Sequence, residues 1–239
     1  MPIFLKLCLA HLVADFILQF EELFQLKLKS IIGHFLHAFC HAAVSLLLLW
    51  PYLGHAWVWG FVLALSVIHC CQDLIKYRLM VQKKELFFLI FVMDQAIHFL
   101  FLSTVLLFPG SQQVLGFATH PVLNELYMEN RWTLYAIVFL VSTFTGSFVM
   151  HAFRTNFIPG SRPDHFITTW EIIHGIVERS LITWVFIFTP NSWPLLLLPF
   201  IGLFRLFYSR ISNKTDFFIS FNYAAAVGII FRLLVNTGS

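Results

Sequence analysis

Residues 86–108 read LFFLIFVMDQAIHFLFLSTVLLF, a stretch long enough and apolar enough to cross a lipid bilayer as one helix. Turn-forming pairs such as Pro109-Gly110 and Pro190-Asn191 separate most of the apolar segments of the chain. The other segments are residues 2–20, 34–54, 55–75, 132–153, 172–188, 192–210 and 216–235. This pattern predicts an all-α fold, a polytopic bundle of about eight transmembrane helices.

The composition of the 239-residue chain supports a membrane environment. Hydrophobic residues make up 59% of the chain and charged residues 11%, whereas soluble domains carry about 25% charged residues. So few charges cannot cover a water-facing surface, and we therefore expect membrane lipids as partners. The net charge of +3 is spread along the chain without a basic tract, so we expect no nucleic-acid partner.

The distribution of basic residues predicts the organisation and orientation of the chain. We expect residues 1–110 to form a four-helix membrane unit and residues 111–239 to add four membrane helices packed on it. With eight spans, one side of the membrane receives little more than Arg131. The other side receives Lys27, Lys29, Lys76, Arg78, Lys83, Lys84, Arg154, Arg162, Arg210 and Lys214. This bias predicts a multi-pass protein of the inner (plasma) membrane, with cytoplasmic basic loops and both termini outside.

The first four segments share pairs of metal-binding residue types spaced four residues apart. Residues at this spacing lie on one helix face, so each segment presents two ligands together. The pairs are His11 and Asp15, His37 and His41, His69 and Asp73, and Asp94 and His98. Imidazole and carboxylate ligands suit zinc, iron or manganese. Eight ligands exceed the needs of one tetrahedral ion, so the set is large enough for two divalent ions.

The depth of these pairs in the membrane also favours one site. Successive spans run in opposite directions with a rise of 1.5 Å per residue, which places most of the eight groups roughly 5–15 Å below the cytoplasmic edge. His11 and His98 lie slightly deeper and Asp73 shallower. An ionised Asp at mid-membrane costs about 2.5–3.5 kcal/mol, so these carboxylates need cationic partners. A buried His/Asp hydrogen-bond network without metal is the alternative interpretation.

Other polar residues adjoin the predicted site. Three glutamines next to the acidic residues are candidates for orienting them: Gln19, Gln72 and Gln95. In a later segment, three residues form either a substrate-binding wall of the same site or a polar group that packs helices: His174, Glu178 and Arg179. His34 lies one turn from His37, near the predicted membrane edge, and we expect it at the interface.

The order of four motifs carries a family resemblance. They read HLVADFILQ from His11 to Gln19, HAFCH from His37 to His41, HCCQD from His69 to Asp73, and DQAIH from Asp94 to His98. In this order they resemble the bacterial membrane family known as domain of unknown function 3307, over about residues 1–110. Residues 175–179, GIVER, are less specifically similar to an element of longer members. The resemblance implies one shared site and no particular activity.

Three functions are compatible with these residues. The first is a membrane-embedded hydrolase of lipidic or amphiphilic substrates, because a metal ion lowers the pKa of bound water towards 7; Asp73 or Asp94 is then a candidate general base. The second is a divalent-cation transporter, ranked lower because residues 44–50 and 99–108 offer few of the polar groups that a carrier needs along its path. The third is a structural protein with a buried polar network.

Overall fold

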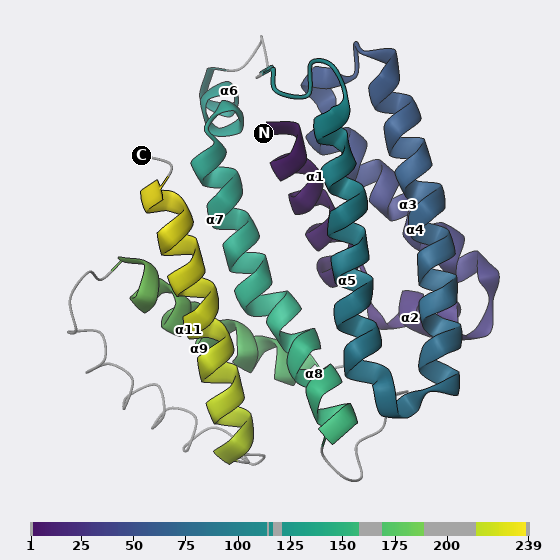
Figure 1. Ribbon diagram of the computed structural model, residues 1–239, viewed down its shortest axis with the longest axis vertical. Helices are drawn as coiled ribbons and strands as arrows, with labels where there is room; N and C mark the ends of the chain where they lie inside the picture. The colour runs from purple at the N-terminus through teal and green to yellow at the C-terminus, as the bar shows by residue number, and fades with distance from the viewer. Residues whose placement is uncertain (1, 114, 117–120, 158–168, 189–213, 238–239) are drawn as a thin grey trace. The chain divides into compact units, whose positions relative to one another are not determined.

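The computed structural model describes residues 2–113, 115–116, 121–157, 169–188 and 214–237. All regular elements in these ranges are helical, which confirms the all-α prediction (Figure 1). The chain forms two compact units. Unit 1 comprises Met1–Ile137 with Thr155–Phe166, and unit 2 comprises Val138–Arg154 with Ile167–Ser239.

Unit 1 contains a four-helix bundle. Its helices are α1 (Pro2–Leu12), α3 (Ile31–Leu48), α4 (Ala56–Gln82) and α5 (Phe87–Ser103), and α1 and α4 each contact both α3 and α5 (Figure 1). Short 3₁₀ turns follow or connect these helices at Trp50–Tyr52, Lys84–Leu86 and Thr104–Leu107. This arrangement brings the four predicted motif segments into mutual contact.

The chain bends sharply after α1. The helix continues through a π-helical segment, Val13–Ile17, and then turns by 83° into α2 (Glu21–Lys29). Ser30 caps α3 by accepting a hydrogen bond from the Ile32 backbone N–H at 3.2 Å. A Cβ atom at Gly33 would lie 2.5 Å from the Lys27 backbone nitrogen, so a glycine is required where α2 packs closely on α3.

The bundle exposes apolar side chains and buries most of its histidines, as expected for a protein in lipid. In α3, His37 is only 1% exposed whereas Phe39 is 69% exposed. Within the described residues, five helices are long and apolar enough to cross a membrane, or six if α1 and α2 count as one broken span. The predicted number of about eight spans is not confirmed. The predicted segment 172–188 is helical without meeting this criterion, and segment 192–210 lies outside the described residues.

The two halves of the bundle differ in chemistry. At the end where α1 begins, the core is apolar and includes Ile3, Leu7, Val58, Phe61 and Leu102. Because neighbouring helices are antiparallel, the later part of α1 meets the first part of α3, the last part of α4 and the first part of α5. Most of the buried histidines and aspartates of the described residues lie in those parts of the helices, with Asp15 in the segment that follows α1 and His98 near the middle of α5.

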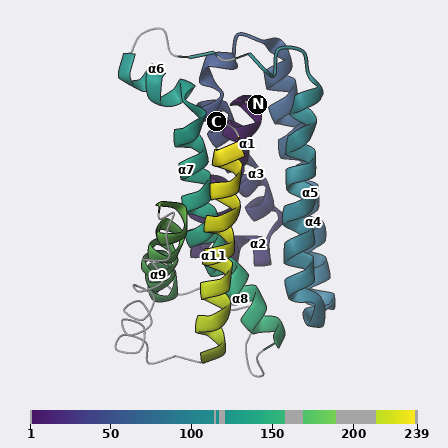
Figure 2. The ribbon, with the colours of Figure 1, turned by 60° about the vertical axis from the view of Figure 1, so that its left-hand side comes forward.

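Helices α6 (Pro121–Met128), α7 (Asn130–Leu140) and α8 (Gly146–Phe157) follow the bundle, with a π-helical segment, Val141–Thr145, between α7 and α8. Unit 2 contains this segment together with α9 (Thr169–Phe188) and α11 (Lys214–Thr237). Helix α9 packs against α11 through Ile182 and Ala224 (Figure 2).

Candidate metal centre

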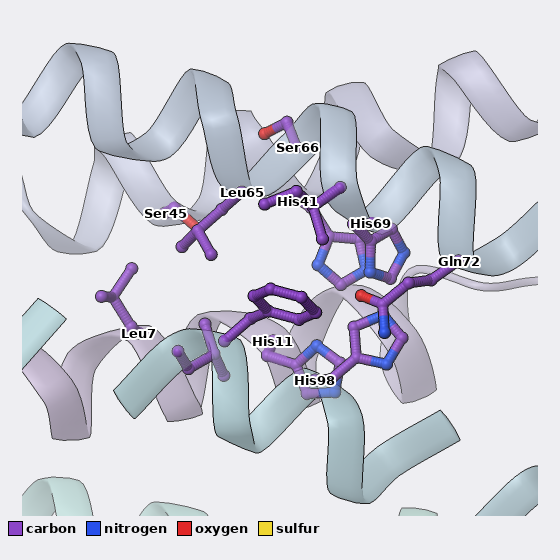
Figure 3. A pocket seen from close by; sticks show the side chains of 12 residues that line it. Leu7, His11, His41, Ser45, Leu65, Ser66, His69, Gln72 and His98 are labelled. Atoms are coloured by element: carbon purple, nitrogen blue, oxygen red, sulfur yellow. The ribbon is translucent and has the colours of Figure 1, made fainter. Parts of the chain in front are cut away.

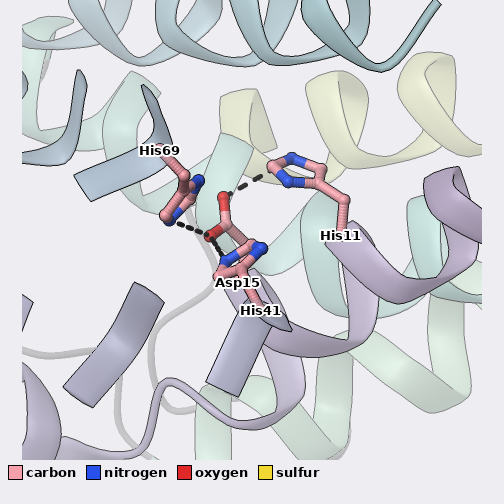
Figure 4. A group of neighbouring side chains, drawn as sticks. All are labelled: His11, Asp15, His41 and His69. Atoms are coloured by element: carbon pink, nitrogen blue, oxygen red, sulfur yellow. Dashed lines mark hydrogen bonds and ion pairs between the residues drawn. The ribbon is translucent and has the colours of Figure 1, made fainter. Parts of the chain in front are cut away.

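Four buried side chains from three helical segments converge in unit 1. His11, Asp15, His41 and His69 each offer one ligand atom, and these atoms lie within 4.8 Å of one another (Figure 4). We call these four residues the Asp15 cluster. They come from α1 with its π-helical extension, from α3 and from α4. The structure therefore brings together a buried His/Asp group within metal-binding distance.

The Asp15 carboxylate is the centre of this group. Its Oδ1 atom lies 2.9 Å from Nε2 of His41, 3.1 Å from Nε2 of His37 and 3.7 Å from Nε2 of His69. Its Oδ2 atom lies 3.6 Å from Nε2 of His11. Four imidazoles thus direct the same ring nitrogen towards one carboxylate. A metal bound by imidazole and carboxylate lies about 2.0–2.2 Å from each ligand atom, so small side-chain shifts suffice to form such a site.

Local helix geometry explains why these side chains meet. Asp15 lies in the π-helical segment, a rare widened turn that often occurs at functional sites. His37 and His41 lie on the same face of α3, and their rings contact each other edge to face with centroids 4.8 Å apart. The ring of His69, from the antiparallel helix α4, lies 3.6 Å from that of His41.

His98 joins the group from α5. Its ring stacks on that of His11 at 4.8 Å and lies 4.5 Å from that of His69. Nδ1 of His98 lies 2.7 Å from the backbone carbonyl oxygen of Asp94 and donates to it, which leaves the lone pair on Nε2. Nε2 is buried without a hydrogen-bond partner among the described residues. A lone pair fixed in this way is suited to bind a metal or to accept a hydrogen bond.

Several other buried ring nitrogens also lack hydrogen-bond partners. Within the part of the chain that the structure describes, these are Nδ1 of His37 and both nitrogens of His69. Each buried polar atom without a partner costs about 1–3 kcal/mol. Without a bound ion, the unpaired nitrogens therefore lower the stability of the folded protein. An ion that binds His69 would offset part of that loss.

The two other predicted carboxylate ligands lie outside the Asp15 cluster. The Asp73 carboxylate lies 3.0 Å from the Lys27 ammonium and 2.7 Å from Nδ1 of His34. The Asp94 carboxylate lies 2.7 Å from the Lys76 ammonium. Each of these acids thus has its own lysine.

The three predicted glutamines occupy different positions. Gln95 donates to Asp15 at 3.1 Å and to Asp94 at 3.2 Å, and its Oε1 atom lies 3.2 Å from Nε2 of His11. It therefore links the Asp15 cluster to the Asp94 ion pair. Gln19 accepts a hydrogen bond from Lys27 at 2.7 Å, and Gln72 lines a cavity beside the cluster.

Sequence reasoning missed three residues of this polar core. His34, expected at the interface, is buried against Asp73. Lys76, expected among the basic loop residues, pairs with Asp94; it shares a helix face with His69 and Asp73, a spacing that identifies it as a candidate partner. Lys27 is also expected among the basic loop residues, but its side chain is fully buried. No local pattern marks Lys27, because its position depends on the bend between α1 and α2.

His174, Glu178 and Arg179 belong to α9 in unit 2. Glu178 and Arg179 are buried, and His174 is half-buried. Arg179 donates to the backbone oxygens of Ser142 at 2.8 Å and Thr143 at 2.9 Å and to the Ser147 hydroxyl at 2.5 Å. Its side chain thus holds α9 against the π-helical segment and the start of α8. Participation of these three residues in the metal site remains a prediction.

A small cavity adjoins the Asp15 cluster (Figure 3). Its volume is about 30 Å³, and His11, His41, His69 and His98 line one part of it. Leu7, Ser45, Leu65 and Leu102 line another part. A cavity needs about 10–15 Å³ to hold one water molecule. The space therefore accommodates a ligand of a few atoms and excludes an acyl chain.

Comparison with known proteins supports the family assignment. A family model described as "Protein of unknown function (DUF3307)" matches residues 3–123. No curated protein and no solved structure matches the chain. The family match confirms the resemblance carried by the four motifs and includes every residue of the Asp15 cluster.

Proposed function

The chain belongs to this DUF3307 family of unknown function, and the family suggests no activity. From the residues of the chain itself, we propose that the Asp15 cluster binds a divalent transition-metal ion inside the membrane. The observation that carries the proposal is the convergence of imidazole nitrogens on one buried carboxylate. Zinc, iron and manganese are the metals that this set of nitrogen and oxygen ligands fits. His11, Asp15, His41 and His69 are the proposed ligands, with His37 and His98 adjacent.

The charges around the site support this proposal. All four ion-pair partners of Asp15 among the described residues are histidines. Asp73 and Asp94, by contrast, are paired with Lys27 and Lys76. A buried carboxylate without a permanent cation is costly in a low-dielectric interior. A divalent ion provides the missing positive charge and at the same time can bind the unpaired Nε2 of His69.

The same charges favour one ion over two. The predicted set of eight ligands included Asp73 and Asp94, whose oxygens are occupied by lysine ammoniums. A second divalent ion would have to displace a lysine and remain close to its positive charge, which Coulomb repulsion opposes. We therefore assign Asp94, with Gln95 as the residue that orients Asp15 and His11, to the support of the site, and Asp73 to a separate ion pair with Lys27.

Hydrolysis is the proposed activity. A metal ion generates a nucleophile from water at neutral pH and polarises carbonyl or phosphoryl groups. The cavity beside the cluster has room for a water-sized ligand. Lipidic or amphiphilic molecules are the proposed substrates because the surrounding helices expose apolar side chains such as Phe39 and Leu63. Since an acyl chain exceeds the cavity, only the reacting group of such a substrate would approach the ion.

We also propose the cellular location from the sequence. The basic residues favour the inner (plasma) membrane, with the basic loops in the cytoplasm and both termini outside. An even number of spans is required for both termini to lie on one side. Reporter fusions at the termini and after residue 83 test this orientation directly, and termini on opposite sides would refute it.

Metal analysis of the detergent-purified protein tests the central proposal. We expect about one divalent ion per chain in the wild type and none in Asp15→Asn, which preserves the side-chain shape but removes the charge. The matched control is the double variant Lys27→Met with Asp73→Asn, which removes another buried ion pair together. It should retain the ion.

The same samples separate the alternative functions. Metal-dependent release of product from a lipid ester in mixed micelles, absent in Asp15→Asn, supports the hydrolase. Metal uptake into vesicles without hydrolysis instead supports the transporter. A wild-type protein that folds normally and takes up no divalent ion would refute the metal site and leave the polar network as the function of the cluster.

A further inference from the structure

The cavity beside the Asp15 cluster has two chemically different parts. Histidines form one part, including His69 and His98, whose buried Nε2 atoms lack partners among the described residues. The rest is mainly apolar and includes Leu7 and Leu65 (Figure 3). A ligand in this space thus touches the proposed ion on one side and hydrocarbon on the other. At about 30 Å³ the cavity limits that ligand to very few atoms.

Charge balance identifies the kind of ligand. Lys27 offsets Asp73 and Lys76 offsets Asp94, so both pairs are neutral. A divalent ion on Asp15 adds two positive charges to one negative charge and leaves one positive charge uncompensated. In a medium of low dielectric constant, an uncompensated charge is far more costly than in water. One further negative charge next to the ion would neutralise the site.

We propose that this cavity binds a small monoanion, of the size of hydroxide or azide, next to the metal ion. The inference rests on the metal site proposed above and specifies the ligand at its open position. Neutralisation of the site would offset the cost of bringing an anion into an apolar space. A protic anion such as hydroxide can make an additional favourable contact, because His98 lines the cavity and its Nε2 lone pair is available to accept a hydrogen bond.

Cobalt(II) makes the proposal measurable, because its visible absorption reports the ligands around it. The full-length protein in detergent is loaded with cobalt, and its metal content is measured before each titration. Azide is then added and compared with acetonitrile, a neutral molecule that also has three heavy atoms in a line. We expect azide to change the spectrum to saturation and acetonitrile to leave it unchanged at the same concentrations.

Two leucines of α4 provide a matched pair of variants. Leu65 lines the cavity, whereas Leu63 is 67% exposed on the lipid-facing surface. Leu65→Phe should fill the space and weaken azide binding by about tenfold or more, a loss of at least about 1.4 kcal/mol. Leu63→Phe should bind azide as the wild type does. Both variants should retain about one cobalt ion per chain.

The outcomes distinguish this inference from the metal site itself. If cobalt binds and azide leaves the spectrum unchanged, the anion site is refuted while the metal site stands. Equal responses to azide and acetonitrile would show that size, and not charge, governs the cavity, and would also refute the proposal. Equal azide binding by Leu65→Phe and Leu63→Phe would place the anion elsewhere. Failure to bind cobalt would refute both proposals.

Discussion

Nε2 of His69 lies 3.7 Å from Oδ1 of Asp15, yet neither ring nitrogen of His69 has a hydrogen-bond partner among the described residues. His69 is buried, and it directs a potential ligand atom at the carboxylate without forming a hydrogen bond to it. This relationship separates the two interpretations of the cluster. A polar network derives its stability from hydrogen bonds, which His69 does not make, whereas a metal site requires a free lone pair.

The first prediction concerns His69→Leu. Leucine removes two unpaired buried nitrogens, each of which costs about 1–3 kcal/mol, so the metal-free protein should be at least as stable as the wild type. Its metal affinity should fall by more than the roughly 10- to 100-fold that loss of an orienting residue costs. Thermal unfolding in detergent with chelator, followed by metal titration, measures both. A marked loss of metal-free stability would favour the polar network.

The second prediction concerns Gln95, which hydrogen-bonds Asp15 and Asp94 and lies beside His11. Gln95→Ala should lower the metal affinity by about 10- to 100-fold while the protein still binds one ion when saturated. Competition with a chelator of known affinity gives this value. Gln72→Ala is the matched control, because Gln72 lines the cavity. Equal effects of the two substitutions would contradict the orienting role of Gln95.

The third prediction concerns the buried pair of Lys27 and Asp73. Lys27→Met leaves the Asp73 carboxylate buried without its cation, so the free energy of unfolding should fall by about 3–5 kcal/mol. Adding Asp73→Asn removes the unpaired charge and should restore most of that loss. Denaturant titration of the two variants in the same detergent measures the difference. If the double variant is less stable than the single one, the pairing is not the source of the stability.

The fourth prediction concerns metal removal. An ion present at 100 times its dissociation constant stabilises the folded state by about 2.7 kcal/mol. Chelation should therefore lower the unfolding temperature of the wild type in detergent. The Asp15→Asn variant, which lacks the central carboxylate, should show no such shift. A shift of equal size in both proteins would mean that the stabilising ion binds elsewhere.

The fifth prediction concerns Gly175 in unit 2. A Cβ atom at this position would collide with the guanidinium of Arg179, which is held by Ser142, Thr143 and Ser147. Gly175→Ala should displace Arg179 and cost about 1.5–3 kcal/mol for each charged hydrogen bond that breaks. Metal content per folded chain should not change, because the Asp15 cluster lies in unit 1. Loss of the ion in this variant would link Arg179 to the metal site.

Much of the fold followed from the sequence because its signals are local. Long apolar runs predict membrane helices, and a spacing of four residues places side chains on one helix face. Antiparallel spans then predict that the four motifs share one depth. The His/Asp group at His11, Asp15, His41 and His69 is consistent with that reasoning. The number of spans did not follow in the same way, because α9 contains three charged residues and is not apolar enough to count as a span.

The sequence by itself determined that this protein is an all-α member of its family, with helices apolar enough to cross a membrane and a His/Asp group inside a helical bundle. Only the tertiary structure decided which carboxylate lies among the imidazoles. Helix periodicity relates residues within one helix, whereas the 83° bend after α1 and the packing of α2 on α3 bring Lys27 to Asp73. Among the described residues, Asp15 thus has only histidines as ion-pair partners, whereas Asp73 and Asp94 each have a lysine, and this difference in charge arises from the packing of the bundle.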